Sequence, residues 1–173
     1  MRPTEEQFLK LLQAEQGKLL RIAFALTGQE SDAWDMVQEA TMRAYDRFGQ
    51  LRGSEDAFGP WIRRILVNAC KNLRRAQFRL VATEEPLATA AAAPELGPEV
   101  QAEGAVLWDE VMQLPEHHRQ VLVLRYLVDL SVDEMARLLW VPPGTVKSRL
   151  NRALGALRLR LESEEGERKV GGV

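Results

Sequence analysis

Residues 81–105 constrain the fold more than any other segment, because they cannot form a packed core themselves. They contain five acidic residues and no Lys or Arg. Their alanines favour a helix, but Pro86, Pro94 and Pro98 leave too little uninterrupted length for one. Few large apolar side chains are present to hold the segment on a core. The sequence therefore predicts two small domains joined by a flexible linker over residues 81–105.

The two flanking segments carry the opposite sign of charge. Residues 1–80 contain 13 Lys and Arg against 10 Asp and Glu, and residues 106–161 contain eight against six. The formal net charge of -2 is thus the sum of two mildly basic blocks, an acidic strip and an acidic tail over residues 162–173. We expect one domain over residues 1–80, a second over residues 106–163, and a tail over residues 164–173.

The composition, with 46% apolar and 28% charged residues, indicates an ordinary globular protein rather than a fibrous or disordered one. No apolar run approaches the roughly 20 residues of a membrane-spanning helix. The N-terminus lacks the basic-then-apolar pattern of a signal peptide. We therefore expect a cytoplasmic protein with no direct membrane insertion. The lone Cys70 excludes an internal disulfide framework and a multi-cysteine metal site.

Apolar residues recur at helical spacing in the first domain, and no strand-like alternation occurs. A first helix is predicted to open at a capping box that begins with Thr4 and to end at Gly28. Ser31 or Asp32 can cap a second helix, and Pro60 suits the first position of a third. The residues expected to face inward are Phe8, Leu11, Leu12, Leu19, Ile22, Leu26, Val37, Thr41, Ala44, Tyr45, Phe48, Trp61, Ile62, Ile65, Leu66, Ala69 and Leu73.

The second domain has the pattern of a helix-turn-helix. Four helices are predicted: residues 105–113, 115–127, 131–139, and a last one that starts at Pro143. The residues expected to face inward are Val121, Leu122, Leu124, Leu127, Val146, Leu150, Ala153, Leu154 and Leu157. A short helix, a three-residue connection over 140–142 and a longer helix form the motif that places side chains in a DNA groove.

The side chains predicted to be exposed on the last helix suit DNA chemically. They are Lys147, Ser148, Arg149, Asn151 and Arg152. Lys and Arg neutralise phosphates or bond guanine, and Asn can bond adenine through two hydrogen bonds. The Thr145 hydroxyl and the free amides of the first turn can meet a phosphate. A basic exposed face is also often simply solvated, so the spacing alone leaves both interpretations open.

Two parts of the chain resemble the sigma-70 superfamily, above all its extracytoplasmic-function branch. Region 4 of that family is similar to LPEHHRQVLVLRYLVDLSVDEMARLLWVPPGTVKSRLNRALGALRLRL. Region 2 is similar to DAWDMVQEATMRAYDRF, the loop LRGSEDAF and PWIRRILVNACKNLRR. The resemblance implies an all-α alternative sigma factor that binds core RNA polymerase, reads the -35 and -10 promoter elements and nucleates DNA melting. It implies no enzymatic activity, no cofactor and no metal.

The resemblance also implies which residues do this. For binding core polymerase, it points to Asp35, Gln38, Glu39 and Arg43. For the single-stranded -10 element, it points to Leu51, Arg52, Gly53, Arg64, Asn68, Lys71, Asn72 and Arg75. For the double-stranded -35 element, it points to Thr145, Lys147, Ser148, Arg149, Asn151 and Arg152. An anti-sigma factor is a further expected partner, by resemblance alone.

Three positions depart from the family pattern. Trp34 stands where an acid is usual, as an interface anchor or as part of the core. Leu51 stands where some members place an aromatic residue, which leaves the base preference open. Trp140 stands where the turn glycine is usual. If that position needs a left-handed backbone, a bulky residue there costs about 1 kcal/mol or more.

Two alternatives remain at this stage. One is a helix-turn-helix regulator that does not engage polymerase, although residues 1–80 resemble neither a ligand-binding nor a phosphorylation domain. The other is a helical adaptor or an inactive sigma-like decoy. An enzyme is disfavoured, because the adjacent His117 and His118 point about 100° apart on a helix and cannot share a metal as an i,i+4 pair does. Cys70 is most simply a small buried side chain.

Overall fold

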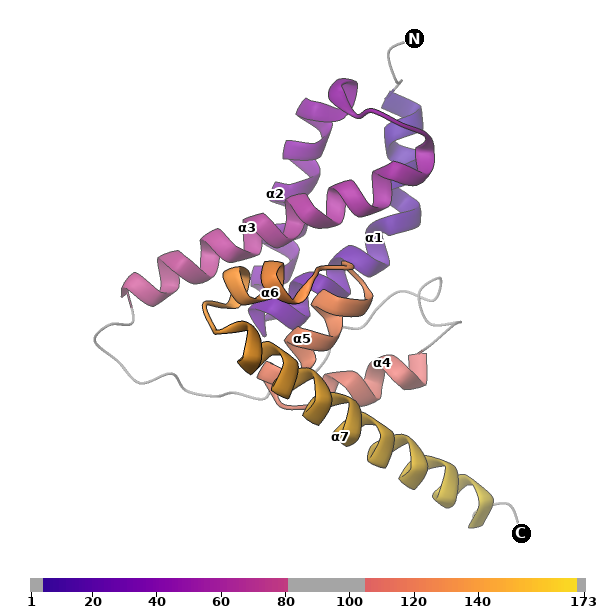
Figure 1. The fold of residues 1–173 in the computed structure, drawn as a ribbon. Helices are drawn as coiled ribbons and strands as arrows, with labels where there is room; N and C mark the ends of the chain where they lie inside the picture. The colour runs from indigo at the N-terminus through magenta and orange to yellow at the C-terminus, as the bar shows by residue number, and fades with distance from the viewer. Residues whose placement is uncertain (1–4, 81–104, 171–173) are drawn as a thin grey trace. The chain divides into compact units, whose positions relative to one another are not determined.

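The computed structural model describes residues 5–80 and 105–170, and it divides into two compact units, Met1–Glu95 and Leu96–Val173 (Figure 1). Within the described residues every regular element is a helix, so the all-α prediction is confirmed. The predicted linker lies outside the described residues, apart from Ala105, which begins a helix.

Three long helices build the first domain, and each packs on the other two. They are α1 (Glu5–Thr27), α2 (Glu30–Arg47) and α3 (Phe58–Leu80). Their shared core includes Leu19, Ile22, Phe24, Ile62 and Leu66, all fully buried. The buried positions of α3 recur every three or four residues, which leaves the opposite side of this helix to solvent.

A cluster of phenylalanines closes the loop between α2 and α3. The loop contains two short 3-10 helices, η1 (Phe48–Gln50) and η2 (Glu55–Ala57). Phe48 and Phe58 flank it, and both rings pack edge-on against Phe8 of α1, with centroids 5.1 and 5.6 Å away. Both ends of the loop are therefore anchored in the core beside Phe8.

The junction between α1 and α2 is tighter than the sequence predicts. Gly28 has φ +75° and donates its N–H to the Phe24 carbonyl at 2.8 Å, which ends α1 at the expected residue. The N-cap of α2 is Gln29, so the prediction that Ser31 or Asp32 caps this helix was wrong. Both predicted caps already lie inside the first turn of α2, which begins at Glu30.

The start of α3 also differs from the prediction. The helix begins at Phe58, two residues before Pro60, because η2 leads directly into it and the buried Phe58 anchors its first turn. Pro60 still fits there, since the first four N–H groups of a helix have no partner within it. Tyr45 was expected to face inward but is exposed, with one ring edge on Phe8. Thr4, with which the predicted capping box begins, lies outside the described residues.

Four helices form the second domain, and α7 packs on the other three. They are α4 (Ala105–Met112), α5 (Glu116–Tyr126), α6 (Val132–Leu139) and α7 (Pro143–Val170). Val121, Leu124, Met135, Val146 and Ala153 form the buried centre, whereas Leu154, expected there, is exposed. Pro115 is the N-cap of α5 rather than its first residue. The predicted tail is helical as far as Val170.

The helix-turn-helix of α6 and α7 has the predicted caps. Ser131 accepts a hydrogen bond from the Glu134 N–H, and the Glu134 carboxylate accepts one from the Ser131 N–H, a complete capping box. Trp140 ends α6 in the left-handed conformation, with φ +58° and ψ +39°. Pro143 begins α7, as predicted.

An ion pair ties the C-terminal half of α7 to α4. Glu110 is 4% exposed and accepts a hydrogen bond from Arg160 Nε at 2.5 Å. Arg160 also donates to the Gln113 side chain. These contacts fix how α4 lies along α7.

Candidate promoter and polymerase interfaces

The N-terminal part of α7 separates a buried side from a polar one. Val146 and Ala153 are fully buried and Leu150 is half-buried, whereas the other side chains between Val146 and Ala153 are polar. Of the six predicted -35 residues, Lys147, Ser148, Asn151 and Arg152 are exposed and Thr145 and Arg149 half-buried. The Ser148 hydroxyl donates to the Thr145 carbonyl at 3.0 Å, which leaves its oxygen free to accept.

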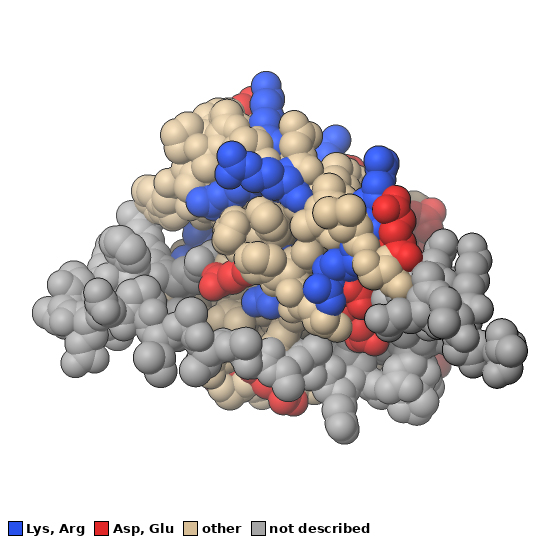
Figure 2. All heavy atoms as spheres, turned by 90° about the horizontal axis from the view of Figure 1, so that it is seen from below, with Lys and Arg blue, Asp and Glu red and all other residues tan. Residues whose placement is uncertain are grey.

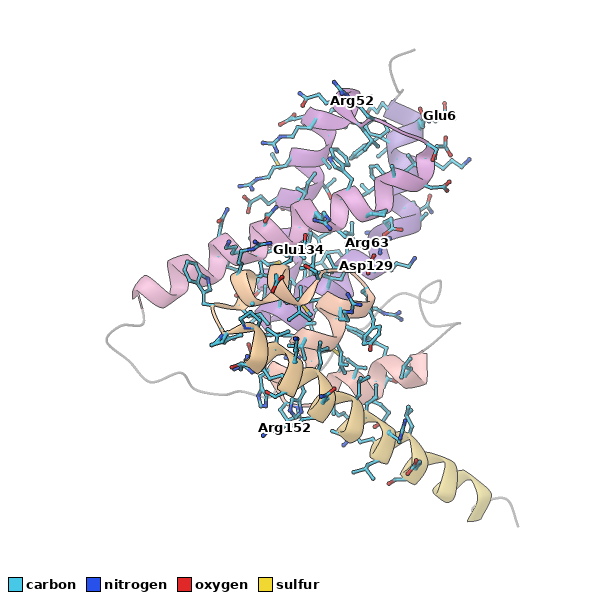
Figure 3. The ribbon with its side chains drawn as sticks, viewed as in Figure 1. Glu6, Arg52, Arg63, Asp129, Glu134 and Arg152 are labelled. Carbon is cyan, nitrogen blue, oxygen red and sulfur yellow. The ribbon has the colours of Figure 1, made fainter. Side chains whose placement is uncertain are left out.

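The cations of this face are not neutralised by neighbouring acids. Lys147, Arg149 and Arg152 form no ion pair within the described residues. Figure 3 shows Arg152 on the N-terminal half of α7. In the surface view of Figure 2, one band of Lys and Arg side chains lies among uncharged atoms, whereas other Lys and Arg side chains lie beside Asp or Glu. Such a surface attracts polyanions.

His118 lies close to this face, which the sequence did not indicate. Burial, and then the positive charges of His117, Arg152 and Arg149, lower the pKa of His118 below its usual value. The sequence pattern offered only the adjacent pair His117–His118, and α5 and α7 are too far apart in the chain for spacing to relate them. Over the described part of the chain, no group of three or more metal-ligating side chains occurs.

One side of α3 carries four of the eight predicted -10 residues. Asn68, Lys71 and Asn72 follow Arg64 by four, seven and eight residues. Lys71 is half-buried, and the other three side chains are exposed. This spacing puts all four on one helical face, opposite the buried side of α3. The side chain of the remaining predicted residue, Arg75, lies outside the described ones.

The predicted loop residues lie elsewhere in the same domain. Arg52 and Gly53 are exposed and Leu51 half-buried. Gly53 has φ +117°, a conformation that favours glycine. Figure 3 shows Arg52 where α2 ends. Asn68 follows the first residue of α3 by ten positions, about 15 Å along the helix, and within the described residues no hydrogen bond or ion pair joins its side chain to the loop.

The predicted polymerase-binding residues lie together on α2. Asp35 and Gln38 are exposed, and Glu39 and Arg43, both half-buried, form an ion pair one turn apart. Trp34 is 44% exposed and Met42 64% exposed on the same helix. The alternative that Trp34 belongs to the core is therefore wrong. Exposed large apolar groups beside charges are typical of protein interfaces.

A second ion pair, unexpected from the sequence, braces the first domain. Arg63 of α3 lies 3.1 Å from a Glu15 carboxylate oxygen of α1, and both side chains are mostly buried. Gln7 of α1 also donates to Glu55 of η2 at 2.8 Å. These contacts join residues 48 positions apart in each case, too far for a local pattern to predict. They hold the start of α3 and the loop in place.

The fold and these faces define a helical, two-domain transcription protein with a helix-turn-helix. Residues 11–79 match the family model of sigma-70 region 2, and residues 105–157 match that of sigma-70 region 4. The chain belongs to the sigma-70 family, in its extracytoplasmic-function branch, and acts as a sigma factor in transcription initiation by RNA polymerase.

Known sigma factors resemble the chain along most of its length. The RNA polymerase sigma-E factor of Streptomyces avermitilis is 33% identical over 159 residues, which cover 92% of this chain and 87% of that protein. The ECF RNA polymerase sigma-E factor of Escherichia coli is 36% identical over 138 residues, 73% of this chain and 72% of that one. The sigma factor RpoE of Bartonella quintana, solved with the anti-sigma factor NepR, has the same fold, with a TM-score of 0.58, 23% identity and 91% and 96% coverage.

Within the described residues, no helix combines the length and the apolar character needed to cross a membrane.

Proposed function

We propose that this sigma factor divides promoter recognition between its two domains. The N-terminal part of α7 reads the -35 element from the major groove. The observation that carries this proposal is the sidedness of α7, which buries Val146 and Ala153 and exposes Lys147, Asn151 and Arg152 without acidic partners. Lys147, Asn151 and Arg152 can bond base edges, and Thr145, Ser148 and Arg149 hold the phosphates.

The polar face of α3 binds the non-template strand of the -10 element. An amide both donates and accepts hydrogen bonds, so Asn68 and Asn72 can bond the edges of unpaired bases. Arg64, Lys71 and Arg75 hold the backbone of the strand. The loop residues Leu51, Arg52 and Gly53 receive a base extruded from the duplex, as base-flipping proteins do with their pockets.

The exposed face of α2 binds core RNA polymerase. Asp35, Gln38, Glu39 and Arg43 supply hydrogen bonds and charge, and the exposed Trp34 supplies an apolar anchor. Buried aromatic anchors ringed by polar groups dominate the affinity of many protein interfaces. An anti-sigma factor that covers these faces would keep the protein inactive.

The protein contributes binding energy rather than chemistry, so we assign it no catalytic residue, cofactor or metal. Its place of action is the cytoplasm, where polymerase and promoters are. Run-off transcription tests the assignment: the chain with core polymerase should start RNA at a restricted set of promoters. A regulator that does not engage polymerase, or a decoy, would leave transcription at the level of core enzyme alone.

Variants of α7 separate -35 reading from polymerase binding. Arg152→Ala and Lys147→Ala should each weaken promoter binding by about 1–3 kcal/mol and relax the dependence on the -35 sequence. Binding to core polymerase should not change. Arg158→Ala, an exposed cation farther along α7, is the matched control. Loss of core binding in the first two variants would contradict the assignment of α7.

Asn68→Ala tests the -10 face. We expect it to reduce open complexes more than closed ones, which permanganate footprinting of unpaired thymines and gel-shift assays measure separately. Gln13→Ala, an exposed amide of α1, should change neither. Unchanged permanganate reactivity in Asn68→Ala would remove Asn68 from the -10 site.

A further inference from the structure

His118 brings a second helix to the DNA-reading end of α7. It is the third residue of α5, a helix that packs directly on α7. The charges of Arg149 and Arg152, which are one turn apart on α7, act on its imidazole. Three basic side chains from two packed helices thus lie within electrostatic range of one another beside the -35 face.

No acid balances this group. The charged groups that act on His118 are His117 from its own helix and Arg149 and Arg152 from α7; none of the described acids of α4, α5 or α6 does so. Glu116, the nearest acid along the chain, accepts a hydrogen bond from Gln120. A positive charge on His118 would be repelled by the charges of Arg149 and Arg152, and an anion between them would relieve that repulsion.

In the free protein the pKa of His118 is lowered, which favours the neutral ring. Burial is the main cause of its lowered pKa, and the neighbouring positive charges add to it. Its Nδ1 atom is buried with no hydrogen-bond partner in the described part of the chain. A buried N–H without an acceptor is costly, so the single ring hydrogen belongs on Nε2. Nε2 is then the atom that can donate outward.

We propose that His118 binds a backbone phosphate of the -35 element together with Arg149. The inference rests on the proposed function of α7. A phosphate between the two side chains would supply the negative charge that the group lacks. His118 would donate from Nε2, and Arg149 would donate from its guanidinium group. The site takes one phosphodiester and carries no base specificity.

The proposal makes DNA binding depend on pH. A bound phosphate raises the pKa of His118, so the complex takes up a proton that the free protein lacks. The gain in affinity is complete below the pKa of the free protein. It falls as the pH rises, and it is gone above the pKa of the complex. A charged His118 also displaces one more counterion from the DNA.

The test measures how DNA binding by the full chain depends on salt. The probe is a fluorescent duplex that carries the -35 element of a promoter transcribed by the holoenzyme. At about pH 5.5 the slope of log K against log[salt] should be steeper by about 0.9 than at about pH 8. His118→Gln should give the shallow slope at both pH values. His117→Gln, which removes the neighbouring exposed imidazole, should keep most of the difference.

The outcomes distinguish this inference from the proposed function. If the wild-type chain and His118→Gln bind the duplex with the same slope at both pH values, His118 does not contact phosphate, although α7 still reads the DNA. If His117→Gln, but not His118→Gln, abolishes the difference, the wrong histidine has been assigned. If the wild-type chain and holoenzyme bind no duplex with preference for the -35 sequence, the proposed function and this inference both fail.

Discussion

Trp140 carries backbone strain at the turn of the helix-turn-helix. Its φ of +58° lies in the left-handed region, and its side chain is 68% exposed. For a residue with a Cβ this conformation costs about 1 kcal/mol or more. The sequence already pointed to this position, because the family usually has glycine there.

Replacing this tryptophan tests the strain. Trp140→Gly should raise the free energy of unfolding of the second domain by up to about 1 kcal/mol, because glycine adopts the left-handed region freely. Denaturant unfolding followed by circular dichroism measures the change. Trp140→Val should lower stability, since a β-branched side chain tolerates this conformation least. A destabilised glycine variant would mean that packing of the indole outweighs the strain.

Glu110 is the most deeply buried acid that the structure describes, and it depends on Arg160. Removing one partner of a buried pair leaves an uncompensated charge, which costs about 3–5 kcal/mol when both partners are buried. Arg160 is partly exposed, so water reduces the loss.

We therefore expect Arg160→Met to destabilise the second domain by about 2 kcal/mol, measured by denaturant unfolding. The double change Glu110→Leu with Arg160→Met should recover most of this, because it removes the buried carboxylate as well. Arg158→Met, at an exposed position nearby, is the control. Equal destabilisation by the single and double changes would show that packing, rather than charge, is what Arg160 provides.

The lowered pKa of His118 has a consequence for stability without DNA. The folded protein binds fewer protons at this site than the unfolded chain, so folding is favoured at pH values above the unfolded pKa. That stability is lost as the pH falls through the folded pKa. Thermal unfolding of the wild-type chain should show a decrease in Tm below about pH 6.5. In His118→Gln the decrease should be smaller, and an unchanged pH profile would contradict the assignment.

At the scale of the helix, two glycines with different surroundings make a matched pair. A Cβ on Gly59 of α3 would lie 2.7 Å from a Glu15 carboxylate oxygen and 2.9 Å from an Arg63 nitrogen, so it would disturb the ion pair between α1 and α3. A Cβ on Gly155 of α7 would meet nothing within 4 Å. Alanine inside a helix is otherwise favoured over glycine by about 1 kcal/mol.

Gly155→Ala should therefore stabilise the second domain by about 1 kcal/mol. Gly59→Ala should give the first domain no such gain, because the better helix former displaces a half-buried ion pair. Denaturant unfolding measures both changes. Equal stabilisation by the two variants would show that Glu15 and Arg63 move aside without loss.

The sequence predicted the helices themselves because their apolar spacing is a local property. It also predicted ends that have their own chemical signal, such as Gly28, Ser131 and Pro143. It failed where a distant contact sets the boundary: Phe58 starts α3 early because its ring packs on Phe8. The sidedness of α7 was predictable for the same local reason. The approach of His118 to Arg149 was not, because it depends on how α5 packs on α7.

At the scale of the whole molecule, the modest basic surplus of each domain limits how tightly the free protein can hold DNA. Few phosphates are neutralised, so the electrostatic part of the affinity is small. Core polymerase would hold both domains at one promoter, which makes the second contact effectively intramolecular.

We expect the free chain to bind a promoter fragment at least about 100-fold more weakly than the holoenzyme. Fluorescence anisotropy with one labelled fragment, at one salt concentration, compares the two. If the free chain bound the fragment as tightly as the holoenzyme does, its own charges would be sufficient for promoter binding.

The ion pair between Glu110 and Arg160 sets a lower limit on how far the chain can be shortened. Arg160 lies about 25 Å along α7 from Pro143, and beyond residue 157, where the match to sigma-70 region 4 ends. A fragment cut at that residue would keep every proposed DNA contact and lose the partner of its buried acid. The smallest stable fragment that could carry -35 recognition into another protein therefore extends past the end of the region 4 match, to at least Arg160.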